Sequence, residues 1–175
     1  MSKTRKMVLL GILVSQALIL HIIERMIPVP VPVPGIKLGL ANAISLVTII
    51  LFGPKEALLV VGLRTFLGSV FGGGVSGFLY SFIGGCISTI AMAVMYKGFR
   101  NLFSLPVISV VGAVFHNIGQ IFIASLIVQN ARLFIYLPIL LVSAVITGLF
   151  IGFAVQYTLR PMKHILRIGS DENVE

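Results

Sequence analysis

Arg64 is the residue in this chain whose type and position most directly suggest chemistry. It interrupts the apolar run LLVVGLRTFLG. If that run crosses a bilayer, an arginine near its middle costs about 2.5–3.5 kcal/mol on insertion scales, so it should face a partner or a wet cavity. Glu24 and Glu56 lie near the ends of apolar runs, and neither is expected to neutralise it. We interpret Arg64 either as a group that binds an anionic or hydrogen-bonding ligand, or as a structural group that binds backbone carbonyls.

Three further polar side chains, His116, Asn117 and Gln120, lie in the apolar run GAVFHNIGQIFIASL. Their spacing places them on one face of a helix, and such a strip in a membrane helix normally faces the bundle interior. It predicts either a solute site or a hydrogen-bond network that ties helices together, and we favour the site. The predicted substrate-binding set comprises Lys37, Asn42, Arg64, His116, Asn117 and Gln120.

The stretch PVPVPVPGIKLGLAN, residues 28–42, has proline at every second position from Pro28 to Pro34. Proline fixes φ and removes a backbone donor, so neither a helix nor a paired strand can run through this segment. It predicts a stiff connector that delivers Lys37, and then a helix beginning around Asn42, to the mouth of an apolar body. The connector is either a lid over a binding site or a short external loop that separates two helices.

Metal and cofactor chemistry is not expected. The histidines His21, His116 and His164 fall in different segments, and the lone Cys86 excludes an intramolecular disulfide and a cysteine cage. His21 and Glu24, three residues apart, either close the same cavity or lie at the membrane interface. Prenyl transfer needs paired aspartates to hold Mg²⁺ on a diphosphate, yet Asp171 is the single aspartate. No phosphate-binding loop with a following Lys and Ser or Thr is present, so we predict no enzyme activity.

The composition indicates an integral membrane protein. Of the 175 residues 58% are apolar and 10% are charged, and the mean hydropathy is +1.11. The net charge of +8 comes from basic residues between long apolar runs, without the aromatic and basic face of a nucleic-acid binder. No small-residue cleavage site follows residues 7–23, so we expect no cleaved signal peptide.

Six segments approach the roughly 20 apolar residues that a span requires. They cover residues 7–26, 36–52, 55–71, 77–96, 105–128 and 134–159. With the N-terminus inside, nine of the thirteen basic residues lie on inner segments, three on outer segments, and Arg64 within a span. Positive residues favour the cytoplasmic side. We predict an all-α bundle of six transmembrane helices with both termini cytoplasmic, comprising one domain at 1–168 and a solvated tail at 169–175.

Small residues four apart occur in three of these segments, and such spacing lets another helix approach closely. Residues 77–96 contain Ser81, Gly85 and Thr89, and residues 134–159 contain Ala144, Gly148 and Gly152. The first segment contains Gly11 and Ser15. Contacts inside the bundle are the default interpretation, and the Gly11 and Ser15 pair is the best candidate for docking a partner protein.

The chain resembles a known family over about residues 5–158. The resemblance is carried by four stretches, KTRKMVLLGILVSQALIL, PVPGIKLGLANAISL, LFGPKEALLVVGLRTFLGS and GAVFHNIGQ. They resemble the membrane proteins called heptaprenyl diphosphate synthase component I, or Gx transporters. These are in turn similar to the substrate-binding S components of energy-coupling factor (ECF) transporters. The most specific pieces are PGIKLGLAN, GPKEAL with Arg64, and HNIGQ.

The resemblance implies a six-helix S-component fold that captures a vitamin-like solute from outside, beneath its first external loop. It also implies docking on a transmembrane T subunit, driven by two cytoplasmic ATPases that use ATP. S components typically dock through alanines four apart in the first helix, and this chain departs from that pattern because its candidates at the same spacing are Gly11 and Ser15. Our leading hypothesis is therefore a solute-binding subunit of a micronutrient importer in a bacterial cell membrane. The alternative is a non-catalytic membrane accessory subunit in isoprenoid or quinone synthesis.

Overall fold

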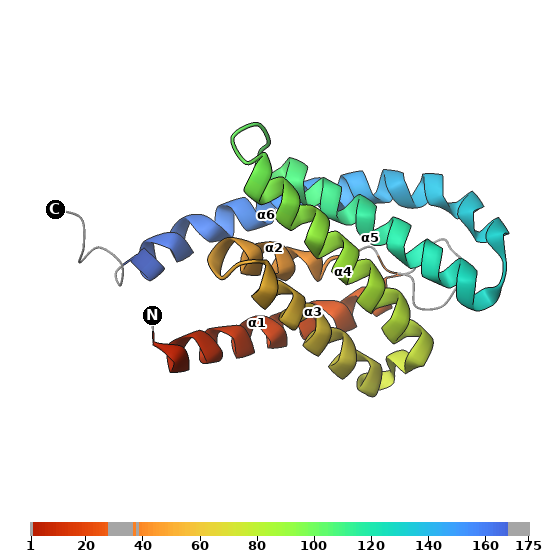
Figure 1. Ribbon diagram of the computed structural model, residues 1–175, viewed down its shortest axis with the longest axis horizontal. Helices are drawn as coiled ribbons and strands as arrows, with labels where there is room; N and C mark the ends of the chain where they lie inside the picture. Colours follow the sequence, from red (N-terminus) through yellow and green to blue (C-terminus); the bar gives the residue numbers. More distant parts are fainter. Residues whose placement is uncertain (1, 28–36, 38, 168–175) are drawn as a thin grey trace.

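The computed structural model describes residues 2–27, 37 and 39–167. Regular structure in these residues is helical throughout, which confirms the all-α prediction (Figure 1). The elements in chain order are α1 (Lys3–Ile23), η1 (Glu24–Met26), α2 (Asn42–Leu51), α3 (Pro54–Gly68), η2 (Ser69–Gly73), α4 (Gly74–Gly98), α5 (Leu105–Val128), η3 (Ala131–Tyr136) and α6 (Leu137–Arg167). The predicted proline connector, residues 28–34, and the predicted tail, 169–175, lie outside the described residues.

Four of the helical segments are long and apolar enough to cross a membrane. They cover Lys3–Met26, Gly74–Gly98, Leu105–Val128 and Ala131–Leu159. Many of their large apolar side chains point outward, including Met7, Phe150 and Tyr157. A surface this apolar suits lipid rather than water. The prediction of a membrane-embedded helical bundle is confirmed at this level.

The second predicted segment differs from the structure in length. The sequence predicts an apolar span over residues 36–52, whereas α2 has only 10 residues and begins at Asn42. A helix of that length rises about 15 Å, half of a bilayer core. Gly39, with φ of +90°, and a turn at Leu40 and Ala41 precede it. The chain therefore reaches the start of α2 as irregular backbone inside the bundle.

The bundle has two distinct ends. The start of α1, the α2–α3 connection, the α4–α5 connection and the end of α6 lie toward the left of Figure 1, and the α3–α4 and α5–α6 connections lie toward the right. At the end of the bundle that contains the α3–α4 connection, Arg25 joins η1 to this connection. Its guanidinium donates hydrogen bonds to the carbonyl oxygens of Gly68 and Phe71. Gly68 is the last residue of α3 and Phe71 lies within η2, where Gly72 has φ of +91° and the helical geometry is broken.

Small residues hold the long helices close together. A β-carbon at Gly152 would lie 2.3 Å from Cα of Pro106, and one at Gly84 would lie 2.9 Å from the carbonyl oxygen of His116. A β-carbon at Gly85 would collide with Val61 of α3. The small residues of α4 and α6 are thus used in contacts inside the bundle, as the default interpretation predicted.

Candidate functional site

A buried polar cluster surrounds the start of α2. Every member of the predicted substrate-binding set is at most 4% exposed, although the set comes from distant parts of the sequence. The segment before α2 provides Lys37, and α2 begins with Asn42. Arg64 lies on α3, and His116, Asn117 and Gln120 lie on α5. The structure therefore gathers the predicted residues inside the bundle rather than on its lipid-facing surface.

Arg64 and Asn42 form the centre of this cluster. Nη2 of Arg64 donates to Oδ1 of Asn42 over 3.2 Å, which joins α3 to the first residue of α2. His116 lies beside them, because a β-carbon at Gly39 would lie 2.8 Å from Nδ2 of Asn42 and 3.1 Å from Cδ2 of His116. Only glycine suits this position, on grounds of both space and φ.

Lys37 and Gln120 hold the irregular segment in place. The backbone N–H of Lys37 donates to Oε1 of Gln120 over 3.0 Å. The ammonium group of Lys37 reaches α1, where it lies 2.7 Å from Nε2 of His21 and donates to the His21 carbonyl oxygen over 3.2 Å. His21, which sequence reasoning left between a cavity and an interface role, therefore lies inside the cluster.

Asn117 lies at the edge of the cluster and faces a different neighbour. Its Nδ2 donates to the carbonyl oxygen of Leu140 over 2.9 Å, so it ties α5 to α6. The three polar residues of α5 are all buried, but this bond serves a helix-to-helix contact. The structure thus shows a helix-to-helix hydrogen bond at Asn117, whereas a solute site among the buried polar side chains around Asn42 stays a prediction.

Glu24 belongs to the buried polar cluster, although the sequence did not predict this position. Its sequence position near the end of an apolar run predicts that it does not neutralise Arg64, whereas in the structure it is 1% exposed and interacts electrostatically with both Lys37 and Arg64. Its Oε1 accepts hydrogen bonds from the backbone N–H groups of Gly39 and Leu40. The buried cations therefore share a buried carboxylate, which corrects the prediction that Arg64 has none.

Several donors around the start of α2 keep unused hydrogen-bonding capacity. Within the described part of the chain, Nδ2 of Asn42, Nε of Arg64 and Nε2 of Gln120 have no hydrogen-bond partner. Leaving a buried polar group unpaired costs about 1–3 kcal/mol. Two cations, one carboxylate and the N-terminus of α2 also leave a formal positive excess. This arrangement is chemically suited to an anionic or carbonyl oxygen, or to ordered water.

The predicted docking pair lies on the outer face of α1. Gly11 and Ser15 are exposed, and a β-carbon at Gly11 would meet nothing within 4 Å. The hydroxyl of Ser15 donates to the carbonyl oxygen of Gly11 in its own helix. Unlike the small residues of α4 and α6, this pair is not used in packing among the described residues. It stays a prediction for partner docking.

Comparison with known proteins gives one finding. The family described as heptaprenyl diphosphate synthase component I has a sequence model that matches residues 13–158. Neither a curated protein nor a solved structure matches the chain. The matched range contains the whole buried polar cluster, together with α2, α3, α4 and α5 in full.

Proposed function

Because the chain belongs to the heptaprenyl diphosphate synthase component I family, we propose that it is a membrane subunit that assists prenyl diphosphate synthesis without catalysing it. The family match carries this proposal. The lack of a paired aspartate motif supports a non-catalytic role, since the sequence has one aspartate, Asp171. In this role the chain anchors a catalytic partner at the membrane, where the long apolar product is soluble.

Reconstitution with a prenyl diphosphate synthase from the same organism tests this role. The synthase is incubated with labelled isopentenyl diphosphate and vesicles, with and without the purified chain. We expect the chain to increase vesicle binding of the synthase and the yield or length of product, and to make no product alone. Equal binding, yield and product length in both conditions would rule out the accessory role.

The buried polar cluster favours a second candidate function, capture of a small solute. We propose that the unpaired donors of Asn42, Arg64 and Gln120 bind an anionic or carbonyl group of a solute that arrives from outside. In that case the exposed Gly11 and Ser15 face suits docking on an ECF T subunit, with two partner ATPases supplying energy from ATP. The proposed location of either complex is the bacterial cell membrane.

Mass spectrometry of molecules that co-purify with the chain tests the second candidate. We expect a bound solute in the wild-type protein and its loss in Arg64→Ala and His116→Ala. Thr147→Ala is a matched control, because its hydroxyl bonds only to its own helix α6. If both cluster variants fold and keep the same ligand at unchanged affinity, the cluster is not the binding site.

A further inference from the structure

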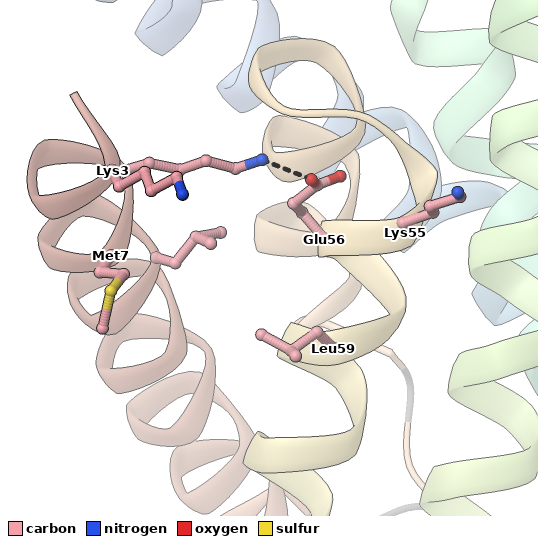
Figure 2. Close-up of a pocket in the computed structure, with 7 residues that line it drawn as sticks. Lys3, Met7, Lys55, Glu56 and Leu59 are labelled. Carbon is pink, nitrogen blue, oxygen red and sulfur yellow. Dashed lines mark hydrogen bonds and ion pairs between the residues drawn. The ribbon is translucent and has the colours of Figure 1, made fainter. Parts of the chain in front are cut away.

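A cleft separates α1 from α3 at the end of the bundle where the chain begins (Figure 2). Its volume is about 440 Å³, within the range of sites that hold small ligands. On α1 the residues Lys3, Lys6, Met7 and Leu10 follow the spacing of a single helix face. On α3 the opposite wall carries Glu56 and Leu59 (Figure 2).

The cleft is polar at its rim and apolar farther into the bundle. Lys3 and Lys6 lie one to two helical turns closer to the start of α1 than Leu10, a separation of about 6–11 Å along the axis. On α3, Leu59 lies one turn beyond Glu56. The cleft thus combines a charged rim with an apolar stretch farther along α1 and α3.

The rim carries more positive than negative charge. Nζ of Lys6 lies 2.5 Å from Oε1 of Glu56, and their side chains are 40% and 23% exposed. Lys55 also borders the cleft, although its side chain extends away from α1 in Figure 2. Three lysines and one glutamate give a formal excess of two positive charges (3 − 1). Lys3 makes no side-chain hydrogen bond to another residue in the part of the chain that the structure describes.

The apolar part of the cleft opens sideways toward the surroundings of the bundle. Met7 is 72% exposed and Leu59 is 53% exposed, although both line it. A chain that enters between them can continue into the bilayer rather than end in a closed pocket. A second cleft, bordered by α1, α2 and α6, measures about 170 Å³ and has no charged residue in its lining.

We propose that the cleft between α1 and α3 binds an anionic amphiphile, with a phosphate or diphosphate head at Lys3 and Lys6 and an apolar chain along Met7, Leu10 and Leu59. An anionic phospholipid and a prenyl diphosphate share this chemistry. The inference goes beyond the proposed function, because the purified chain alone must bind such a ligand whether or not a synthase is present.

Binding of geranylgeranyl diphosphate to the full chain in neutral detergent tests the proposal. The Lys3→Gln/Lys6→Gln variant should bind about 20-fold more weakly, because each interfacial lysine attracts a nearby anionic group. Wild-type binding should weaken as salt increases. Lys97→Gln is the matched control, since Lys97 is exposed at the same end of the bundle on α4. Equal affinities for the wild-type chain and the double variant would overturn the proposal.

Two further variants test the head and chain subsites separately. Glu56→Gln removes the carboxylate that occupies Lys6, so it should tighten binding several-fold. Leu59→Gln places an amide in the apolar part and should weaken geranylgeranyl diphosphate binding while leaving the rim charges intact. Unchanged affinity in both variants would contradict the proposal even if the double lysine variant failed to insert.

Probe chemistry identifies the source of the ligand. Geranylgeraniol, which lacks the charge, and inorganic pyrophosphate, which lacks the chain, should each compete at least 10-fold more weakly than geranylgeranyl diphosphate. Displacement by phosphatidylglycerol would assign the cleft to membrane lipid, and resistance to it would assign the cleft to prenyl diphosphates. Equal competition by geranylgeraniol would show that charge plays no part and would overturn the inference.

Discussion

The carboxylate of Glu24 acts on the backbone just before α2 as an anion acts at a helix N-terminus. Backbone N–H groups at membrane depth must find partners within the protein, because lipid offers none. Those of Gly39 and Leu40 find Oε1 of Glu24. The same carboxylate lies in the field of Lys37 and Arg64, so one side chain both stabilises the irregular segment and balances the buried cations.

Replacing Glu24 should therefore destabilise the bundle. We expect Glu24→Ala to lower the free energy of unfolding by about 3 kcal/mol, because it leaves two buried N–H groups unpaired. Glu24→Gln keeps an accepting oxygen and should cost less. Thermal unfolding followed by circular dichroism in detergent measures both changes. If the alanine variant were as stable as the wild type, the structural role of this carboxylate would be refuted.

Arg25 stabilises irregular backbone in a similar way at the C-terminal end of α3. Its guanidinium donates hydrogen bonds to the carbonyl oxygens of Gly68 and Phe71, next to the break in helical geometry at Phe71 and Gly72. Arg25→Ala should lower the free energy of unfolding by about 1–2 kcal/mol and speed amide hydrogen exchange in η2. Arg132→Ala, at an exposed arginine of the same end of the bundle, is the control. Equal rates of amide hydrogen exchange in η2 in the two variants would show that the hydrogen bonds of Arg25 do not stabilise this element.

At the scale of elements, α5 could be predicted from sequence alone and α2 could not. The bounds of α5, residues 105–128, were predicted as observed, because proline near its start and a polar residue in left-handed geometry at Gln129 end the apolar run on both sides. The sequence from Ile36 to Ala41 contains no comparable signal that would end the apolar run. The backbone N–H groups of Lys37, Gly39 and Leu40 instead donate to side-chain oxygens of Gln120 and Glu24, which are distant in sequence, and these bonds hold the three residues outside the helix.

The same distinction applies to the candidate site. Arg64, His116 and Gln120 could be identified because a polar residue inside an apolar run must face the interior. Glu24 could not, because its position near the end of α1 suggests the membrane surface. Glu24 is buried because the backbone at Gly39 and Leu40 lies inside the bundle and donates hydrogen bonds to its carboxylate. This arrangement depends on tertiary packing and not on local sequence. The pairing of His21 with Lys37 depends on tertiary packing as well.

Close helix packing at glycine gives a prediction with an internal control. Gly152→Ala places a methyl group against the backbone of Pro106 and should destabilise the α5–α6 contact by about 1–3 kcal/mol. Gly11→Ala meets open space and should be neutral or stabilising by up to about 1 kcal/mol. Thermal unfolding of the two variants side by side measures this difference. Equal destabilisation by Gly152→Ala and Gly11→Ala would show that close contact with Pro106 does not explain the effect at Gly152.

At the scale of the whole molecule, basic residues gather at one end of the bundle. The end of the bundle that contains the start of α1 and the end of α6 also contains the start of α3, the end of α4 and the α4–α5 connection (Figure 1). These parts carry Lys55, Lys97 and Arg100 respectively. The opposite end carries Arg25 and Arg132. Clustering of basic residues at one end is the signal that orients membrane proteins. It predicts that the cleft between α1 and α3 lies in the inner leaflet.

Cysteine accessibility in intact cells tests this orientation. In a Cys86→Ser background, which removes the single native cysteine, Thr4→Cys and Asn101→Cys should resist a membrane-impermeant maleimide until the cells are opened. Ser76→Cys and Ala131→Cys should react at once, since both positions are exposed at the other end of the bundle. The Cys86→Ser chain alone is the blank. Labelling of Thr4→Cys in intact cells, with protection of Ala131→Cys, would show the opposite orientation. The cleft between α1 and α3 would then lie in the outer leaflet, where a cytoplasmic synthase could not exchange a ligand with it.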